Sequence, residues 1–184
     1  MNEKALRILE YNKIIEKLTD HATSPMGKDM CRKLLPTADL GEICQNQMET
    51  SDALSRIYAK GSLSFSGLRD IRDSLLRLKV GSSLSVTELM HIASLLETAL
   101  RAKSYGRRET DDMNTDSLDS LFNAIEPLSP VCREIRRCIL SEEEIADDAS
   151  PGLKHVRRSI KLTNERIHSQ LNSMVNSSSV SSML

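Results

Sequence analysis

The feature that most constrains this chain is a row of apolar residues near its C-terminal end, which recurs at three- and four-residue steps. The row follows Ser150-Pro151, a pair typical of a helix start, because a serine hydroxyl caps free amides and proline suits the first turn. Its members are Leu153, Val156, Ile160, Thr163, Ile167, Leu171 and Met174. Such steps form a narrow, coiled-coil-like seam, so we expect this helix to lie against one or two partners in an elongated arm.

Composition extends the helical prediction to the whole chain. The sequence has 184 residues, of which 39% are apolar and only 3% aromatic, with no Trp. Leu, Ile, Met, Glu, Lys and Arg favour helices, whereas strands favour the scarce aromatic residues. We therefore predict an all-α fold, an elongated multi-helix bundle that ends in the coiled-coil-like helix.

Capping signals divide the rest of the chain into helices. Ser24-Pro25 and Asp39 are expected to begin two of them, with Glu42 reaching back to the Asp39 cap, and Ser85-Val86-Thr87-Glu88 is a capping box. Gly61 and Gly81 mark helix ends. The expected helices cover about 6–20, with a soft break at Tyr11-Asn12, then 25–35, 39–60, 68–78, 86–103, 118–125 and 130–139. Leu63 and Phe65 alternate with serines and indicate a short extended piece.

Two parts follow from this pattern: a helical core over 1–149, and the start of a long arm helix over 150–184, expected to continue beyond Leu184. The polar stretch from Ser104 to Asp112 is expected to be an exposed connection and the first site of proteolysis.

The sequence contains no motif for catalysis, cofactor binding or metal binding. It has no G-x-x-x-x-G-K-[ST] loop for nucleotide phosphates, and its histidines, His21, His91, His155 and His168, lack zinc spacing. The acidic clusters Glu142-Glu143-Glu144 and Asp147-Asp148 lack the spacing of a calcium loop, so we interpret them as a solvated turn. No catalytic, cofactor or metal residues are therefore predicted.

The cysteines and the hydropathy indicate where the chain resides. Cys31, Cys44, Cys132 and Cys138 form no C-x-x-C pair and are expected to be reduced core thiols. No apolar run reaches the roughly 18 residues of a membrane span, and the N-terminus is not a signal peptide. We expect a cytoplasmic protein that does not contact membranes.

Basic residues supply the one candidate binding surface. The net charge of -1 provides no global attraction to nucleic acid, so binding requires a local patch. Arg133, Arg136 and Arg137 form one cluster; Lys154, Arg157, Arg158 and Lys161 form another at helical steps. The second cluster is either a solvated helix flank or a sequence-independent contact to a phosphate backbone.

Several motifs resemble the bacterial MutS two family. Ser24-Pro25-Met26-Gly27-Lys28, Leu34-Leu35-Pro36 and a helix with Glu49, Asp52 and Ala53-Leu54 are similar to the opening of the MutS core domain. The MutS two branch is indicated by Gly67-Leu68-Arg69-Asp70-Ile71-Arg72, by Gly81, Leu84 and Glu88-Leu89, and by Asp148-Ala149-Ser150-Pro151, Leu153 and Val156-Arg157-Arg158. Gly152, and an acidic turn without glycine, depart from the family pattern.

The resemblance implies that 1–149 is a lever domain and 150–184 the root of a clamp arm. The parent would be a homodimeric, ATP- and Mg-dependent clamp that binds branched DNA or ribosomal RNA. It would suppress homologous recombination and, in some members, act on stalled ribosomes. Its ATPase and C-terminal endonuclease domains are absent from this sequence, so this segment is expected to transmit conformational change without catalysis. The alternative is a free-standing helical adaptor whose exposed seam docks a partner helix.

Overall fold

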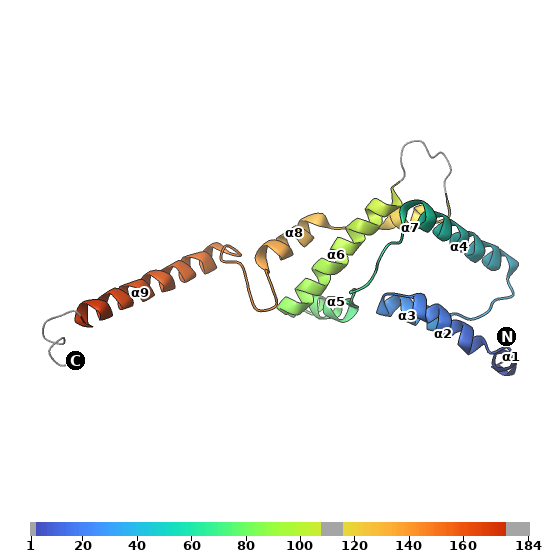
Figure 1. Cartoon of the computed structure of the whole chain (residues 1–184), viewed down its shortest axis with the longest axis horizontal. Helices are drawn as coiled ribbons and strands as arrows, with labels where there is room; N and C mark the ends of the chain where they lie inside the picture. Colours follow the sequence, from blue (N-terminus) through green and yellow to red (C-terminus); the bar gives the residue numbers. More distant parts are fainter. Residues whose placement is uncertain (1–2, 108–115, 176–184) are drawn as a thin grey trace. The chain divides into compact units, whose positions relative to one another are not determined.

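A computed structural model describes residues 3–107 and 116–175, and within these ranges it contains nine helices and one isolated bridge, between Ile139 and Ile145. The all-α prediction is confirmed. The helices are α1 (Glu3–Ile8), α2 (Tyr11–His21), α3 (Pro25–Lys33), α4 (Leu40–Lys60), α5 (Arg72–Lys79), α6 (Val86–Gly106), α7 (Asp119–Ala124), α8 (Ser129–Cys138) and α9 (Pro151–Val175) (Figure 1). The chain forms two compact units, Met1–Arg133 and Glu134–Leu184, which divide within α8.

The soft break expected in the first helix is a true interruption. Glu10 has a φ of 52°, a left-handed conformation that cannot continue an α-helix, so α1 ends before it and α2 starts after it. α2 packs against both α1 and α3. The Tyr11 hydroxyl donates to the carbonyl of Leu34, 3.3 Å away, and joins the start of α2 to the residue after α3.

The expected caps form at α3, α4 and α6. The Ser24 hydroxyl accepts from the Gly27 amide at 3.0 Å, and Asp39 accepts from the Glu42 amide at 3.1 Å. The return contact from Glu42 is replaced, because the Asp39 amide donates to the Thr37 hydroxyl at 3.2 Å. The capping box of Ser85 with Glu88 is complete.

The segment between α4 and α5 differs from the prediction in two respects. The extended piece around Leu63 and Phe65 is not a strand; it is irregular chain. α5 starts at Arg72 and not at Leu68, because the Asp70 carboxylate accepts from the Arg72 amide at 3.0 Å and also pairs with the Arg72 side chain. This local turn competes with an earlier helix start. Gly61 and Gly81 adopt positive φ angles near the predicted helix ends.

α6 is the most buried element of the first unit. Ala93 is 0% exposed, and Ala102 and Thr98 are also buried. Small side chains let neighbouring elements approach closely: a Cβ on Gly106 would overlap the Cβ and Cγ atoms of Phe122 in α7. α6 extends three residues past its predicted end at Lys103. The rest of the expected connection, 108–112, lies outside the described residues.

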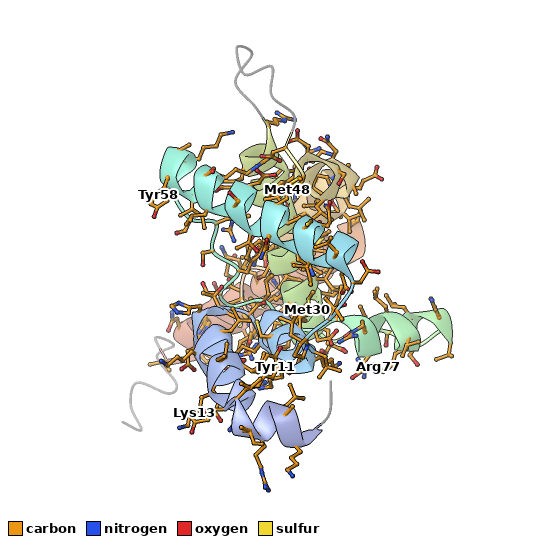
Figure 2. The ribbon with its side chains drawn as sticks, turned by 90° about the vertical axis from the view of Figure 1, so that its right-hand side faces the viewer. Tyr11, Lys13, Met30, Met48, Tyr58 and Arg77 are labelled. Carbon is orange, nitrogen blue, oxygen red and sulfur yellow. The ribbon has the colours of Figure 1, made fainter. Side chains whose placement is uncertain are left out.

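Many large apolar side chains remain exposed. Met30 on α3 and Met48 and Tyr58 on α4 are examples that can be followed in Figure 2. The cysteines are free thiols, but they are not core residues as expected: Cys44 is exposed and the others are partly buried. None of the described helices combines the length and hydropathy needed to cross a bilayer.

Candidate nucleic-acid interface

The predicted nucleic-acid residues all lie in the first half of α9. The Ser150 hydroxyl accepts from the Leu153 amide at 3.1 Å and fixes the helix start, as expected. Lys154, Arg158 and Lys161 are exposed and follow one another at four- and three-residue steps, so they form a row along one side of the helix. We call these three residues the basic row.

Arg157 differs from the basic row because it is engaged in the fold. Its Nη1 donates to the Ile145 carbonyl at 2.8 Å and pairs with the Asp147 carboxylate. The side chain is partly buried as a result. Of the four predicted residues, Arg157 therefore holds the preceding turn against α9, and the basic row remains exposed.

The turn before α9 is a folded elbow, 138–149, and not just a solvated acidic stretch. The Ala146 amide donates to the Cys138 carbonyl at 2.9 Å, and Ile139 and Ala146 are buried. Arg137 of α8 donates to the carbonyls of Asp148, at 2.9 Å, and Ala149, at 3.4 Å. One arginine from α8 and one from α9 thus hold the same segment.

The basic cluster on α8 is largely committed to local contacts. Arg137 pairs with Glu134, and this hydrogen-bonded pair raises the pKa of Arg137 and lowers the pKa of Glu134. The Arg133 Nε donates to the Ser129 carbonyl at 3.4 Å. The basic row on α9 is therefore the better candidate for an external phosphate.

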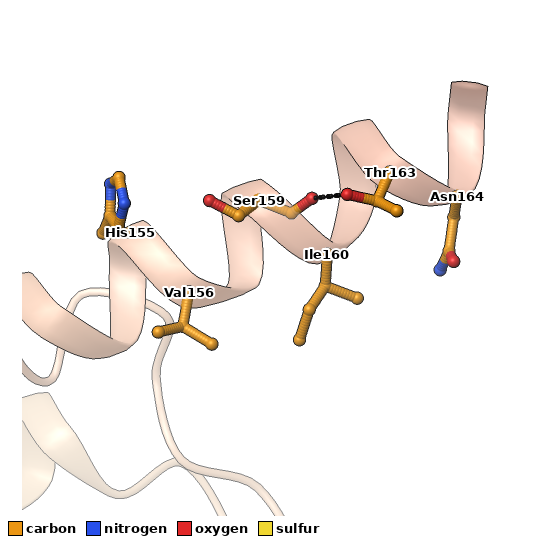
Figure 3. Close-up of a pocket in the computed structure, with 6 residues that line it drawn as sticks. All are labelled: His155, Val156, Ser159, Ile160, Thr163 and Asn164. Atoms are coloured by element: carbon orange, nitrogen blue, oxygen red, sulfur yellow. Dashed lines mark hydrogen bonds between the residues drawn. The ribbon is translucent and has the colours of Figure 1, made fainter. Parts of the chain in front are cut away.

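The apolar seam of α9 lies exposed as well. Val156, Ile160, Ile167 and Leu171 are each about half exposed, and a shallow hollow follows the helix over His155–Asn164. Figure 3 shows Val156 and Ile160 extending to one side of α9 while His155 extends to the other. The coiled-coil prediction requires a partner helix that covers this side.

Sequence reasoning missed a buried ion cluster in the first unit. Arg56 of α4 is only 8% exposed; its Nε donates to Asp116 and its Nη2 donates to Asp116 and Asp119, each at 2.6 Å. The guanidinium carbon lies 4.9 Å from the ring centre of Phe122, within cation–π range. Asp52, one turn before Arg56, accepts from both the amide and the hydroxyl of Ser117. The i, i+4 spacing of Asp52 and Arg56 was a visible signal, but it resembles an ordinary surface pair.

A second charged centre joins α5 to α6. Glu88 accepts from the Ser85 amide at 2.9 Å and from the Ser74 hydroxyl at 2.8 Å, and it pairs with Arg77, labelled in Figure 2. These contacts, the Ser85 amide first, lower the pKa of Glu88 to about 2. Glu88 therefore serves both the predicted capping box of α6 and a tertiary contact with α5.

The described histidines and carboxylates assemble no metal site. No group of three or more potential ligands gathers within the part of the chain that the structure describes. His21, His155 and His168 are exposed and His91 is partly buried.

Comparison with known proteins identifies relatives over the full chain. No family model matches. The chain is 58% identical to Endonuclease MutS2 of Lachnoclostridium phytofermentans over 100% of this chain and 24% of that protein. It is 50% identical to Endonuclease MutS2 of Agathobacter rectalis over 100% of this chain and 23% of that protein. For Endonuclease MutS2 of Lachnospira eligens the identity is 41%, over 96% of this chain and 22% of that protein.

The chain spans about a quarter of the length of these curated relatives. The match falls in their N-terminal part, as the motifs around Ser24-Pro25 and Ser150-Pro151 predicted. This confirms the recognition from sequence: the chain belongs, as an N-terminal segment, to the MutS2 family.

Proposed function

We propose that this chain is a non-catalytic segment of a MutS2 protein which transmits conformational change and contacts nucleic acid through α9. The observation that carries the proposal is the exposed basic row of Lys154, Arg158 and Lys161. Three cations at helical spacing match a phosphate backbone electrostatically and carry no base-specific groups, so binding is expected to be independent of nucleotide sequence.

In this proposal residues 1–149 form the lever and 150–184 the root of the clamp arm. The parent is a cytoplasmic, homodimeric, ATP- and Mg-dependent clamp with an endonuclease domain. It acts on branched DNA or ribosomal RNA, suppresses recombination and, in some members, acts on stalled ribosomes. Support comes from membership in a family whose relatives are named endonucleases. The ATPase and nuclease activities belong to parts of the parent that this sequence does not contain.

The nucleic-acid contact is tested by fluorescence anisotropy with four-way-junction and duplex DNA at two salt concentrations. K154A/R158A/K161A should weaken binding and reduce the slope of log Kd against log salt by about one per lost phosphate contact. K17A/K33A/K79A is the matched control, because it removes three exposed positive charges from the first unit.

Equal losses in the two triple variants would attribute binding to net charge and overturn the contact. R157A distinguishes a structural role from direct contact with DNA. Arg157 holds the elbow, so its removal should reduce DNA binding less than removal of the basic row. If wild-type protein does not bind either DNA, α9 serves transmission only.

The transmission role is tested in a chimera in which this segment replaces the matching part of the Lachnoclostridium phytofermentans protein. R56M weakens the buried ion cluster that joins α4 to Asp116 and Asp119. It should reduce the effect of DNA on ATP turnover more than it reduces basal turnover. Unchanged coupling would argue against a lever that works through this cluster.

The alternative function, a helical adaptor, is favoured by the exposed apolar seam of α9. An adaptor would capture a helix from another protein through the seam. Loss of DNA binding in the basic-row variant would favour the MutS2 role, since an adaptor depends on Val156, Ile160, Ile167 and Leu171 and not on the basic row.

A further inference from the structure

A hollow in the first unit lies between the start of α2 and the end of α3, and α1 also contributes to its lining. Its volume is about 390 Å³, near the lower end of the range for ligand-binding clefts. Arg7 and Arg32 are its charged lining residues, and no acidic residue lines it among those that the structure describes. Its apolar lining residues are Leu6, Ile15, Leu34 and Leu35.

The wall formed by Leu34 and Leu35 is fixed before any partner binds. The Leu34 amide donates to the Cys31 carbonyl at 3.2 Å, and the Tyr11 hydroxyl donates to the Leu34 carbonyl at 3.3 Å (Tyr11 is labelled in Figure 2). Pro36 follows, and a proline keeps the residue before it out of the helical conformation. The two leucines therefore leave α3 as extended chain, and binding requires little ordering of the site.

The apolar wall is accessible to a partner. Leu34 is 46% exposed and Leu35 is 72% exposed. Met30, one helical turn before Leu34 on α3, is 73% exposed and continues the apolar surface beyond the hollow (Figure 2). Apolar surface that continues from a hollow along a helix is a feature of protein interaction sites. Its extent favours a peptide segment over a small molecule as the occupant.

The two arginines determine the charge of that occupant. Arg7 of α1 is exposed and pairs with no carboxylate among the described residues. Arg32 of α3 pairs with Asp29 at 3.1 Å, but both side chains are well exposed, so this pair is weak and a bound carboxylate can replace Asp29. Glu10 is already paired with Lys13 at 2.7 Å. The hollow is therefore complementary to a carboxylate, which arginine binds through two parallel hydrogen bonds.

The surrounding elements determine the backbone conformation of the occupant. Within 3–107 and 116–175 the structure contains no strand, so the hollow offers no sheet edge to which an extended peptide could add. A peptide that lies on apolar side chains must satisfy its own backbone N–H and C=O groups, and a helix does so internally. Helices bind such hollows through apolar residues at three- and four-residue steps.

From these observations we propose that the hollow between α2 and α3 is a docking site for an acidic amphipathic helix of another protein. The apolar side of that helix lies against Leu34 and Leu35, and its carboxylates pair with Arg7 and Arg32. The proposal goes beyond the nucleic-acid contact and does not depend on it, because the hollow lies in the first unit and the basic row lies in the second. Peptide binding and DNA binding can therefore fail separately.

Fluorescence anisotropy with labelled helical peptides tests the charge requirement. One probe carries leucines at i, i+4 and i+7 and glutamates beside them; a second probe has lysines in place of the glutamates. The wild-type chain should bind the glutamate probe at least about tenfold more tightly than the lysine probe. R7E/R32E should reverse this preference. K17E/K79E is the matched control, because it makes the same charge change at exposed lysines outside the hollow, and it should keep the wild-type preference.

L35S tests the apolar wall with the same glutamate probe. It should weaken binding at least about tenfold, because the leucine would be buried by the bound helix. L76S is its control: Leu76 is also exposed but lies on α5, outside the hollow, so its substitution should leave binding unchanged. Circular dichroism checks that each variant stays helical. No binding of the glutamate probe by wild type, equal effects of L35S and L76S, or an unchanged preference in R7E/R32E would each overturn the proposal.

The chimera with the Lachnoclostridium phytofermentans protein distinguishes an external partner from the parent's own chain. If the chimera binds the glutamate probe as tightly as the isolated chain, the hollow is free for another protein, as proposed. If only the isolated chain binds, the hollow is covered in the parent by its own chain or by a second copy, and the proposal of an external partner is overturned.

Discussion

Arg56 shows how one residue can join segments that are distant in sequence. Its guanidinium is buried and bound to Asp116 and Asp119, whose side chains are 21% and 18% exposed. Its Nη1 is buried with no hydrogen-bond partner among the described residues, so the cluster is costly to desolvate. Such a cluster stabilises the fold only while all its members are present.

Removing the cation should therefore destabilise the first unit. R56M removes the buried guanidinium that bonds to both Asp116 and Asp119, and we expect a loss of about 3 kcal/mol in the free energy of unfolding. R69M is the control: Arg69 is exposed, and its substitution should change stability by less than about 0.5 kcal/mol. Urea denaturation of both variants measures the difference; equal curves would show that the cluster contributes nothing net.

Substitution by alanine is expected to have opposite effects on stability at Gly106 and Gly152. G106A should cost about 1 to 3 kcal/mol, because the new Cβ overlaps Phe122 and α6 must separate from α7. G152A should stabilise α9 by about 0.5 to 1 kcal/mol, because nothing lies near its Cβ and alanine favours helix. Thermal unfolding of the pair compares them, and a destabilising G152A would contradict the open surroundings of that residue.

At the scale of elements, the junction of α5 with α6 should respond to acid. The pKa of Glu88 is lowered in the fold to about 2 from an ordinary value of 4.5. Between these pH values the unfolded chain binds a proton that the folded chain does not, so stability rises with pH. The contribution is complete above about pH 4.5 and is lost as pH falls towards 2.

E88Q should remove this dependence, and its stability should decline less than that of wild type over the same acid range. Urea denaturation at several pH values measures both slopes. S74A is a useful companion, since it removes one donor to Glu88 and should give an intermediate slope. Parallel slopes for wild type and E88Q would contradict the hydrogen-bonded carboxylate.

Local signals determined which elements could be predicted from sequence. Helix caps such as Ser24 and Ser85 bond to an amide three residues later, so the local sequence is enough to predict them. The predicted start of α5 at Leu68 was wrong. The Asp70 side chain accepts a hydrogen bond from the Arg72 amide, and this local turn outweighs the helical spacing of the apolar residues. The Arg56 cluster could not be found, because its partners lie 60 and 63 residues away.

At the scale of the whole molecule, the division into two compact units makes a prediction about cooperativity. The elbow of the second unit is held by Arg157, through Ile145 and Asp147, and the first unit is built around α6. The elbow's arginine contacts join α8 to α9 within 134–184. The units should therefore lose structure separately when only one of them is perturbed.

R157A tests this separation by hydrogen exchange. The Ala146 amide, which bonds to the Cys138 carbonyl, should exchange faster once the elbow loses its contacts to α9. Protection around Ala93 and Ala102 in α6 should stay unchanged, because those residues are buried within the first unit. R158A is the control, since Arg158 is exposed and lies one residue away. Faster exchange in both units would mean that they unfold as one cooperative unit.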